Sequence, residues 1–251
     1  MRRIESIKPV DPTANRCGNC GAELTGDYCA ACGQRRSQRL SLKRSLRDGV
    51  GQLSEFDFAF ARTFRGLSSR PGPTAIEYID GRRASFTHPF RYAFLLVTAY
   101  VLAIHLFDLD IRAPGAPLDS EKAQAAVRVI ASLLAYLFFP SIMVVAGLQR
   151  WLARQERFNY SETLAYCAYC HSHITLWSTL VGATIGFQSL AGIGLLLGGQ
   201  SAYHVWGLRG FYDWGYPRCV GVAVLLLLCS LVASNLFGLG VANLAALAGL
   251  I

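Results

Sequence analysis

The second half of the chain consists mainly of apolar runs, each about long enough to cross a membrane as a helix. Crossing the hydrocarbon core of a bilayer takes about 20 apolar residues in a helix. The runs after residue 88 are 89–107, 128–149, 163–186, 187–208 and 219–240. Only 16% of the 251 residues are charged and 53% are hydrophobic, which also favours a membrane protein. The sequence therefore predicts an all-α, multi-pass membrane bundle of about five transmembrane helices in residues 89–251.

Proline and glycine predict where these runs bend or break. Pro140 would kink the second run unless neighbouring groups take up the freed carbonyl, and residues 186–188 separate the third run from the fourth. As one helix, residues 219–251 would be about 50 Å long, which is more than one crossing. We therefore expect a break at Gly238 and Gly240, with a surface tail whose course the sequence leaves open.

The distribution of charge predicts the orientation. Most basic residues lie in 1–91, and the loops 150–162 and 209–218 add further arginines, whereas the loop 108–127 is mainly acidic. By the positive-inside rule, the N-terminus is cytoplasmic and, after five crossings, the C-terminus is outside. Residues 1–16 are polar, so we expect no cleavable signal peptide. The net charge of +8 follows from this asymmetry, and nucleic-acid binding is not needed to explain it.

Four cysteines near the N-terminus have the spacing of a closed metal site. They are Cys17, Cys20, Cys29 and Cys32, in two Cys-x-x-Cys-Gly pairs. Each pair aims two sulfurs at one ion, and two pairs complete a tetrahedral site with four protein ligands, as in structural zinc sites. Gly21 and Gly33 stand where each turn curls back and a positive φ is wanted.

The cysteine segment therefore predicts a zinc-ribbon head over residues 1–37, with structural Zn²⁺ as its cofactor. Residues 22–24 and 28–29 would form the arms of a small β-hairpin around 25–27. Disulfides are the rival interpretation. Thiols stay reduced in the cytosol, however, and a unit this small has too little core to fold without metal.

Residues 38–88 are predicted to link the head to the bundle. Apolar residues from Leu42 to Leu67 recur at steps of three or four, with basic residues beside them, as in an amphipathic helix. This helix would lie flat on the inner leaflet or pack under the bundle, and both alternatives stay open. Residues 71–73 end it. Thr74 to Glu77 then reads as a capping box that starts a short helix ending at Gly81.

The order of these motifs resembles a known protein family. The motifs are the two cysteine pairs, the Gln34 that follows them, Arg70-Pro71-Gly72, Tyr78-Ile-Asp-Gly81-Arg82-Arg83 and Pro89-Phe90-Arg91-Tyr92. The family is a bacterial membrane family catalogued as domain of unknown function number three-six-six-seven. The resemblance covers residues 17–92 well and the spans loosely. It implies a multi-pass protein of the bacterial inner membrane with a zinc head, and no particular chemistry.

A second group of metal-binding residue types lies in the predicted spans. Cys167-Ala-Tyr-Cys170-His171 spells the attachment motif of a c-type haem, but it lies inside a span at the cytoplasmic end, whereas that haem is attached on the outer face. Cys167, Cys170 and His171 share a helix face and could meet His204 and Cys219. A second metal site, a b-type haem or a proton path is then conceivable. We favour hydrogen bonds between helices instead.

Two functions from different classes remain open. The first is a non-enzymatic membrane protein whose head binds a partner protein, with the bundle as anchor in the lipid bilayer and possible self-association through Gly-x-x-x-Gly pairs. The second is a small transporter or membrane enzyme that uses the polar residues of the third to fifth spans. The scarcity of polar residues in the spans favours the first, and no catalytic residue is predicted.

Overall fold

The computed structural model describes residues 15–36, 39–43, 58–107, 138–185 and 190–247, with isolated positions between 129 and 136. Within these stretches the named elements are all helices: α2 (Phe58–Ser69), α3 (Pro71–Ile79), α4 (Pro89–Leu106), α6 (Phe138–Leu152), α7 (Tyr160–Ile185), α8 (Leu190–Tyr212) and α9 (Tyr216–Leu247). The predicted all-α class is confirmed for the described residues.

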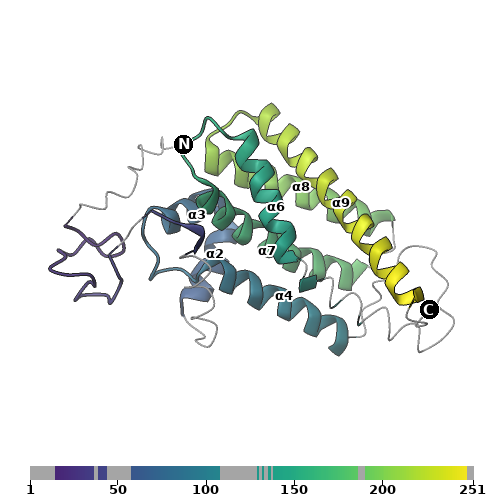
Figure 1. Cartoon of the computed structure of the whole chain (residues 1–251), viewed down its shortest axis with the longest axis horizontal. Coiled ribbons are helices and arrows are strands. Elements are labelled where there is room, and N and C mark those ends of the chain that lie inside the picture. The colour runs from purple at the N-terminus through teal and green to yellow at the C-terminus, as the bar shows by residue number, and fades with distance from the viewer. Residues whose placement is uncertain are drawn as a thin grey trace.

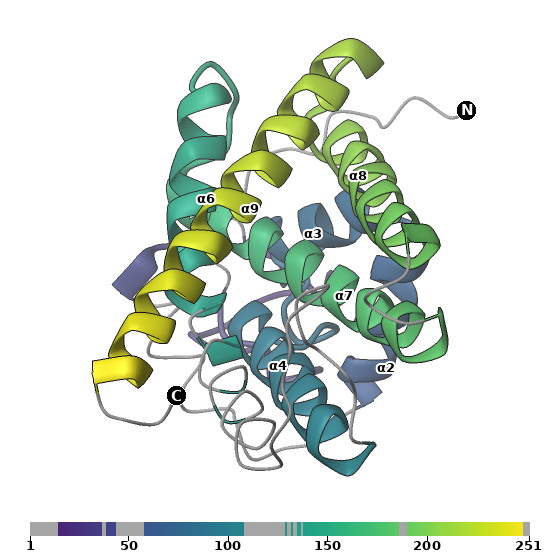
Figure 2. The same ribbon diagram turned by 90° about the vertical axis from the view of Figure 1, so that its right-hand side faces the viewer.

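Helix α7 lies at the centre of the bundle. It packs against α4, α6 and α8, and against the shorter helices α2 and α3. Helix α9 lies on the outside, across α6 and α8 (Figures 1 and 2). The first half of α7 is accordingly buried from Leu164 to Cys170, including the side chains of Tyr166 and Tyr169. The cysteine segment lies at one end of the bundle (Figure 1).

The described helices support the predicted spans to different degrees. By length and composition, α4 is the one helix of the described part that is long and apolar enough to cross a membrane. Its start was predicted well, because Pro89 stands in its first turn after His88. Helices α7 and α8 are separate, as predicted, and the residues between them at 186–189 lie outside the description, as does the loop at 108–127.

The predicted break in the last run is wrong. Helix α9 has 32 residues and continues through Gly238 and Gly240 to Leu247. Glycine weakens a helix by only about 1 kcal/mol relative to alanine, so two glycines need not end it. Residues 248–251 lie outside the described part. Pro140 is the third residue of α6 as described, and residues 135 and 136 before it are helical as well. The predicted kink at Pro140 stays a prediction.

The short helix after residue 70 begins earlier than predicted. Helix α3 starts at Pro71 rather than at Thr74, so the predicted capping box is wrong, and the Thr74 hydroxyl inside the helix has no hydrogen-bond partner. A Cβ built on Gly72 would lie 2.3 Å from the backbone carbon of Gly210. Helix α3 thus packs directly on the backbone of α8. Helix α3 ends at Ile79, and Gly81 follows its C-cap with φ +113°, which fits the predicted glycine stop.

The predicted amphipathic stretch is described at Leu42 and Lys43 and in helix α2, and residues 44–57 lie outside the description. Leu67 is fully buried, and Phe60 and Phe64 pack against the main core. The Phe64 ring lies 5.1 Å from that of His173, centroid to centroid. Of the two predicted alternatives, a helix flat on the inner leaflet or a helix packed under the bundle, α2 therefore follows the second.

Candidate metal centre and its docking surface

Two knuckles of the same shape form the N-terminal head. In the first, the Cys17 N–H donates to the Ala22 carbonyl and the Gly21 N–H to the Cys17 carbonyl. The second repeats this pattern twelve residues later, from Cys29 to Gln34 and from Gly33 to Cys29. Both glycines have positive φ, +75° and +71°, as predicted.

The pairing inside the head differs from the predicted hairpin. Isolated antiparallel bridges join Arg16 to Glu23 and Tyr28 to Arg35. Each bridge closes one knuckle on itself, whereas the prediction paired residues 22–24 with 28–29. The reason is local: the turn at each Cys-x-x-Cys-Gly brings its own flanks together before the two knuckles meet.

The four cysteine sulfurs meet between the knuckles. All four lie within 4.8 Å of one another. The Cys17–Cys32 and Cys20–Cys29 sulfur pairs are each 3.6 Å apart. A tetrahedral ion with metal–sulfur bonds of about 2.3 Å places its ligands about 3.8 Å apart, so the cluster is compatible with one metal ion. The four predicted ligands are thereby brought together.

Two thiols of this cluster, those of Cys20 and Cys32, have pKa values shifted in opposite directions. The Gln34 backbone N–H lowers the pKa of Cys32 to about 7, against the smaller effect of burial. At Cys20 the Ala22 backbone favours the thiolate, but hydrogen bonds with Cys29 and Cys32 outweigh it and raise the pKa to about 12. Four adjacent thiols therefore ionise together only when a cation compensates their charge.

The head is held on the bundle through residues of both knuckles. The Gln34 side chain donates to the Gly81 carbonyl at 2.6 Å and accepts from the Ala84 N–H at 2.8 Å. From the other knuckle, Asn19 accepts a hydrogen bond from the Ser85 hydroxyl at 2.6 Å. The docking surface is thus the loop at 80–88 between α3 and α4. Because Gln34 also closes the second knuckle, the cysteine fold and its docking are directly coupled.

The chain after the head is anchored at the start of α7. Arg39 forms an ion pair with Glu162 at 2.9 Å and donates to the Arg157 carbonyl. Glu162 also accepts from the Asn159 N–H, and the Asn159 side chain accepts from the Glu162 N–H. This is a capping box, which the sequence analysis missed although Asn-Tyr-Ser-Glu spells it.

The polar residues of the predicted spans do not gather into a second centre. The cysteine head is the one group of three or more His, Cys, Asp or Glu residues with metal-binding spacing in the described part. Cys167 donates to the Gln149 side chain, and Cys219 to the Trp214 carbonyl. The structure does bring His171 and His204 together, with ring centroids 4.4 Å apart, and the His171 Nε2 has no hydrogen-bond partner.

The interhelical hydrogen bonds favoured for His171 and His204 are found instead at His173, which that prediction did not include. Its Nδ1 lies 2.7 Å from the Tyr92 hydroxyl and its Nε2 lies 3.1 Å from the Ser68 hydroxyl. Trp177 donates to the same Nε2 at 3.2 Å. This histidine therefore ties α2, α4 and α7 together, and a structural role accounts for it.

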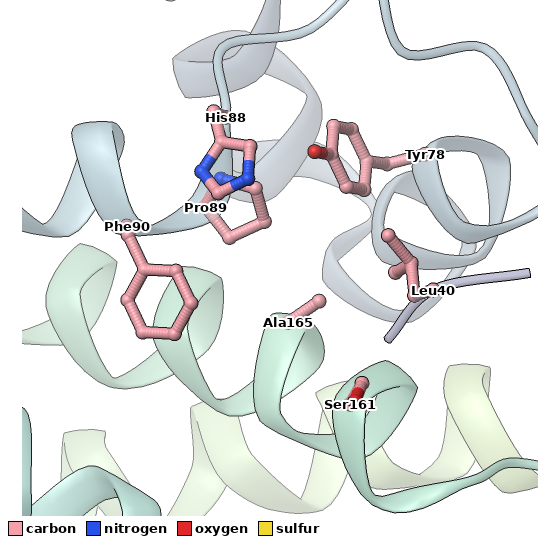
Figure 3. Close-up of a pocket in the computed structure, with 7 residues that line it drawn as sticks. All are labelled: Leu40, Tyr78, His88, Pro89, Phe90, Ser161 and Ala165. Atoms are coloured by element: carbon pink, nitrogen blue, oxygen red, sulfur yellow. The ribbon is translucent and has the colours of Figure 1, made fainter. Parts of the chain in front are cut away.

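A small cavity lies beside the docking surface, between Leu40, α3, α7 and the start of α4. Figure 3 shows the rings of Tyr78 and His88 above it, packed edge to face with centroids 6.1 Å apart, with Ala165 and Ser161 on α7 below. The volume is about 10 Å³, room for about one water molecule. It is too small for an organic substrate.

These features define a helical protein with a four-cysteine head docked at one end of its bundle. Residues 57–101 match the model of a family described as Protein of unknown function (DUF3667). The match covers α2, α3 and most of α4, including the docking loop, and it confirms the resemblance there. No curated protein and no solved structure matches the chain.

Proposed function

We propose that this protein is a zinc-binding, multi-pass membrane protein of the bacterial inner membrane, with a non-enzymatic role in binding a partner protein. The observation that carries the proposal is the four-cysteine cluster docked on the loop at 80–88. Thiolate sets of this kind select zinc among the common divalent ions. With four protein ligands, the site has no open position for a substrate, so its role is structural.

Zinc analysis of the purified protein tests the first part. One zinc per chain is expected, and Cys→Ser at Cys17, Cys20, Cys29 or Cys32 should lower the content. Cys229, which is half-buried in α9 outside the head, supplies the matched control: Cys229→Ser should leave zinc unchanged. If all four head variants kept full zinc content, the assignment would fail.

The surface of the bundle supports the membrane part. Helices α7, α8 and α9 have 26, 23 and 32 residues, so each is long enough for one crossing, although α4 alone among the described helices is also apolar enough throughout. Val220, Val224, Leu228 and Val232 form an exposed apolar stripe along α9. Such a stripe is unfavourable in water and ordinary against lipid tails. The five spans therefore remain our proposal.

The head also has a surface that the bundle leaves open. Docking uses Asn19 and Gln34, while Tyr28 remains 63% exposed. Exposed aromatic side chains on a rigid support are common anchors at protein interfaces. We therefore assign partner binding to the Tyr28 side of the head and the anchoring role to the bundle.

The alternative is a small transporter or membrane enzyme, favoured by the contact between His171 and His204. Ionisable groups at membrane depth often mark function. Complementation of a deletion strain separates the two readings. The adaptor requires rescue by a variant in which Cys167, Cys170, His171 and His204 are replaced with residues of similar size, and none by a head variant that lacks the four cysteines. The opposite pattern would favour the transporter or enzyme.

A further inference from the structure

Helices α6 and α9, which pack against each other, each have an exposed apolar stripe. On α6, Val144 and Trp151 stand seven residues apart and are 74% and 62% exposed. On α9, Tyr216, Val220 and Val224 follow one another at steps of four and are exposed as well. Positions four or seven apart lie on the same face of a helix. Two adjacent helices therefore present apolar faces that no described part of the chain covers.

Each stripe ends in an aromatic residue at the same end of the bundle. Trp151 stands one residue before the end of α6, and Tyr216 is the first residue of α9. The Arg218 side chain donates to the Leu152 carbonyl at 3.4 Å, so the end of α6 lies beside the start of α9 (Figures 1 and 2). Exposed tryptophan and tyrosine at the edge of an apolar surface are typical of the level at which a membrane meets water.

The chain beyond this edge is rich in arginine. Residues 150–157 and 209–218 contain five arginines against two carboxylates, those of Glu156 and Asp213. Glu156 is engaged with Arg218, whose guanidinium lies 3.7 Å from its carboxylate. This end of the bundle therefore has an excess of positive charge next to the two aromatic residues.

Arg154 and Arg209 have no carboxylate partner in the part of the chain that the structure describes. Arg154 is exposed in the turn that follows α6. The Arg209 guanidinium lies over the ring of Tyr216, 4.0 Å from its centroid. Such a contact with a ring holds a guanidinium in place and leaves its N–H groups for an anion. Arginine binds phosphate oxygens well, because its N–H groups match them in geometry and in charge.

We propose that the surface around Trp151, Arg154, Arg209 and Tyr216 binds the headgroups of anionic phospholipids. This lipid site rests on the membrane bundle proposed above and adds which class of lipid the protein holds and where. The apolar stripes contact the acyl chains, the two aromatic rings lie at the interface, and the arginines contact the phosphates. An anionic headgroup fits better than a zwitterionic one, because an ammonium group would add positive charge to a surface that already has an excess.

Quenching of Trp151 fluorescence by brominated lipids tests the proposal at the site itself. The full-length protein is reconstituted in phosphatidylcholine vesicles that contain either brominated phosphatidylglycerol or brominated phosphatidylcholine. The difference between wild type and Trp151→Phe isolates the signal of this residue. Brominated phosphatidylglycerol should quench it at a several-fold lower mole fraction than brominated phosphatidylcholine. Arg154→Gln and Arg209→Gln should each lower this preference by up to about fivefold, the effect of one arginine near an anionic surface.

Two further variants separate local charge from fold and net charge. Arg209→Lys keeps the charge and should retain most of the preference. Arg16→Gln removes an exposed arginine of the head and should leave the preference unchanged. Equal quenching by the two brominated lipids, or a preference that survives in both glutamine variants, would overturn the proposal. Failure of both lipids to quench Trp151 would also overturn it, because another protein surface, such as a second copy of the chain, would then cover the site.

Alkaline extraction of membranes that contain the protein distinguishes the lipid site from the membrane bundle on which it rests. Release of the chain into the soluble fraction would overturn both. Retention in the membrane combined with equal quenching by the two lipids would overturn the lipid site alone.

Discussion

At the residue scale, Gln34 links the two parts of the molecule. Its backbone carbonyl closes the second knuckle, and its side chain joins two backbone groups of the loop at 80–88. The sequence could single out Gln34 only by its place after the second cysteine pair. Its role depends on a partner 47 residues away, which local spacing does not reveal.

Gln34→Ala should release the head from the bundle without emptying the metal site. The variant loses two hydrogen bonds, one buried and one partly buried, each with a net value of about 1 kcal/mol, so the detached state should become about tenfold or more populated. Limited proteolysis, which reports such opened states, should separate the head faster in this variant. Zinc content should remain that of wild type, because the four sulfurs are untouched.

Tyr28→Ala provides the control for that experiment, since this side chain is exposed and lies off the docking surface. It should be cleaved at the wild-type rate. Equal cleavage of Gln34→Ala and wild type would mean that the contacts with Gly81 and Ala84 do not hold the head.

At the scale of elements, helix boundaries set by local sequence signals were predicted correctly, and those set by tertiary contacts were not. Helix α4 was predicted well because apolar composition and an initial proline are local signals. The start of α3 was not, because Pro71 and Gly72 look like a terminator in isolation. They are helical because the missing side chain of Gly72 lets α3 lie on the backbone of α8 at Gly210, a tertiary contact that outweighs local preference.

Gly72→Ala should therefore destabilise the bundle. The added methyl group would lie 2.3 Å from the backbone of Gly210, and overpacking of this kind costs typically about 1–3 kcal/mol. Thermal unfolding in detergent should show a lower Tm. The matched change is Gly194→Ala, where nothing lies within 4 Å of the new methyl. It should leave the Tm unchanged or raise it, since alanine favours a helix.

The spacing of glycines along the sequence does not identify the ones that pack closely. Gly194 and Gly198 form one of the Gly-x-x-x-Gly pairs considered for self-association, and a Cβ at either would meet open space within this chain. Among the glycines that the structure describes, the closely packed ones are Gly66, Gly72, Gly207 and Gly210. A Tm for Gly72→Ala at or above that of wild type would mean that α3 and α8 are not in the contact described.

At the scale of the whole molecule, the loops predicted to be cytoplasmic meet at one end of the bundle. The loop after α3 contacts the loop before α7 through Asp80 and Arg157, 3.7 Å apart. That loop in turn contacts the one before α9, where the Trp214 indole donates to Glu156 at 2.6 Å. The head docks at the same end. The distribution of basic residues predicts that these segments lie on one side of a membrane. Their contacts with one another are consistent with that prediction.

The contacts do not say which end of the bundle faces the cytoplasm, so the orientation stays a prediction of the charge distribution. Reporter fusions after Arg83, Arg157 and Arg218 should all read as cytoplasmic, and fusions after Asp119 and Ile251 should read as external. The three cytoplasmic sites lie in or beside loops that contact one another, so they must give the same result whatever the orientation. The fusion at Asp119 separates the two sides, because α4 alone lies between it and Arg83 among the described helices.

The C-terminal fusion is the most informative of the five. Because α9 is one continuous helix, a hairpin within residues 219–247 does not explain a cytoplasmic C-terminus. Such a result would instead mean that α9 does not cross, and its exposed stripe from Val220 to Val232 would then need a protein partner or an interfacial position. An external C-terminus with three cytoplasmic loops requires α7 and α8 to cross as a pair joined at 186–189, which completes five crossings with a cytoplasmic head.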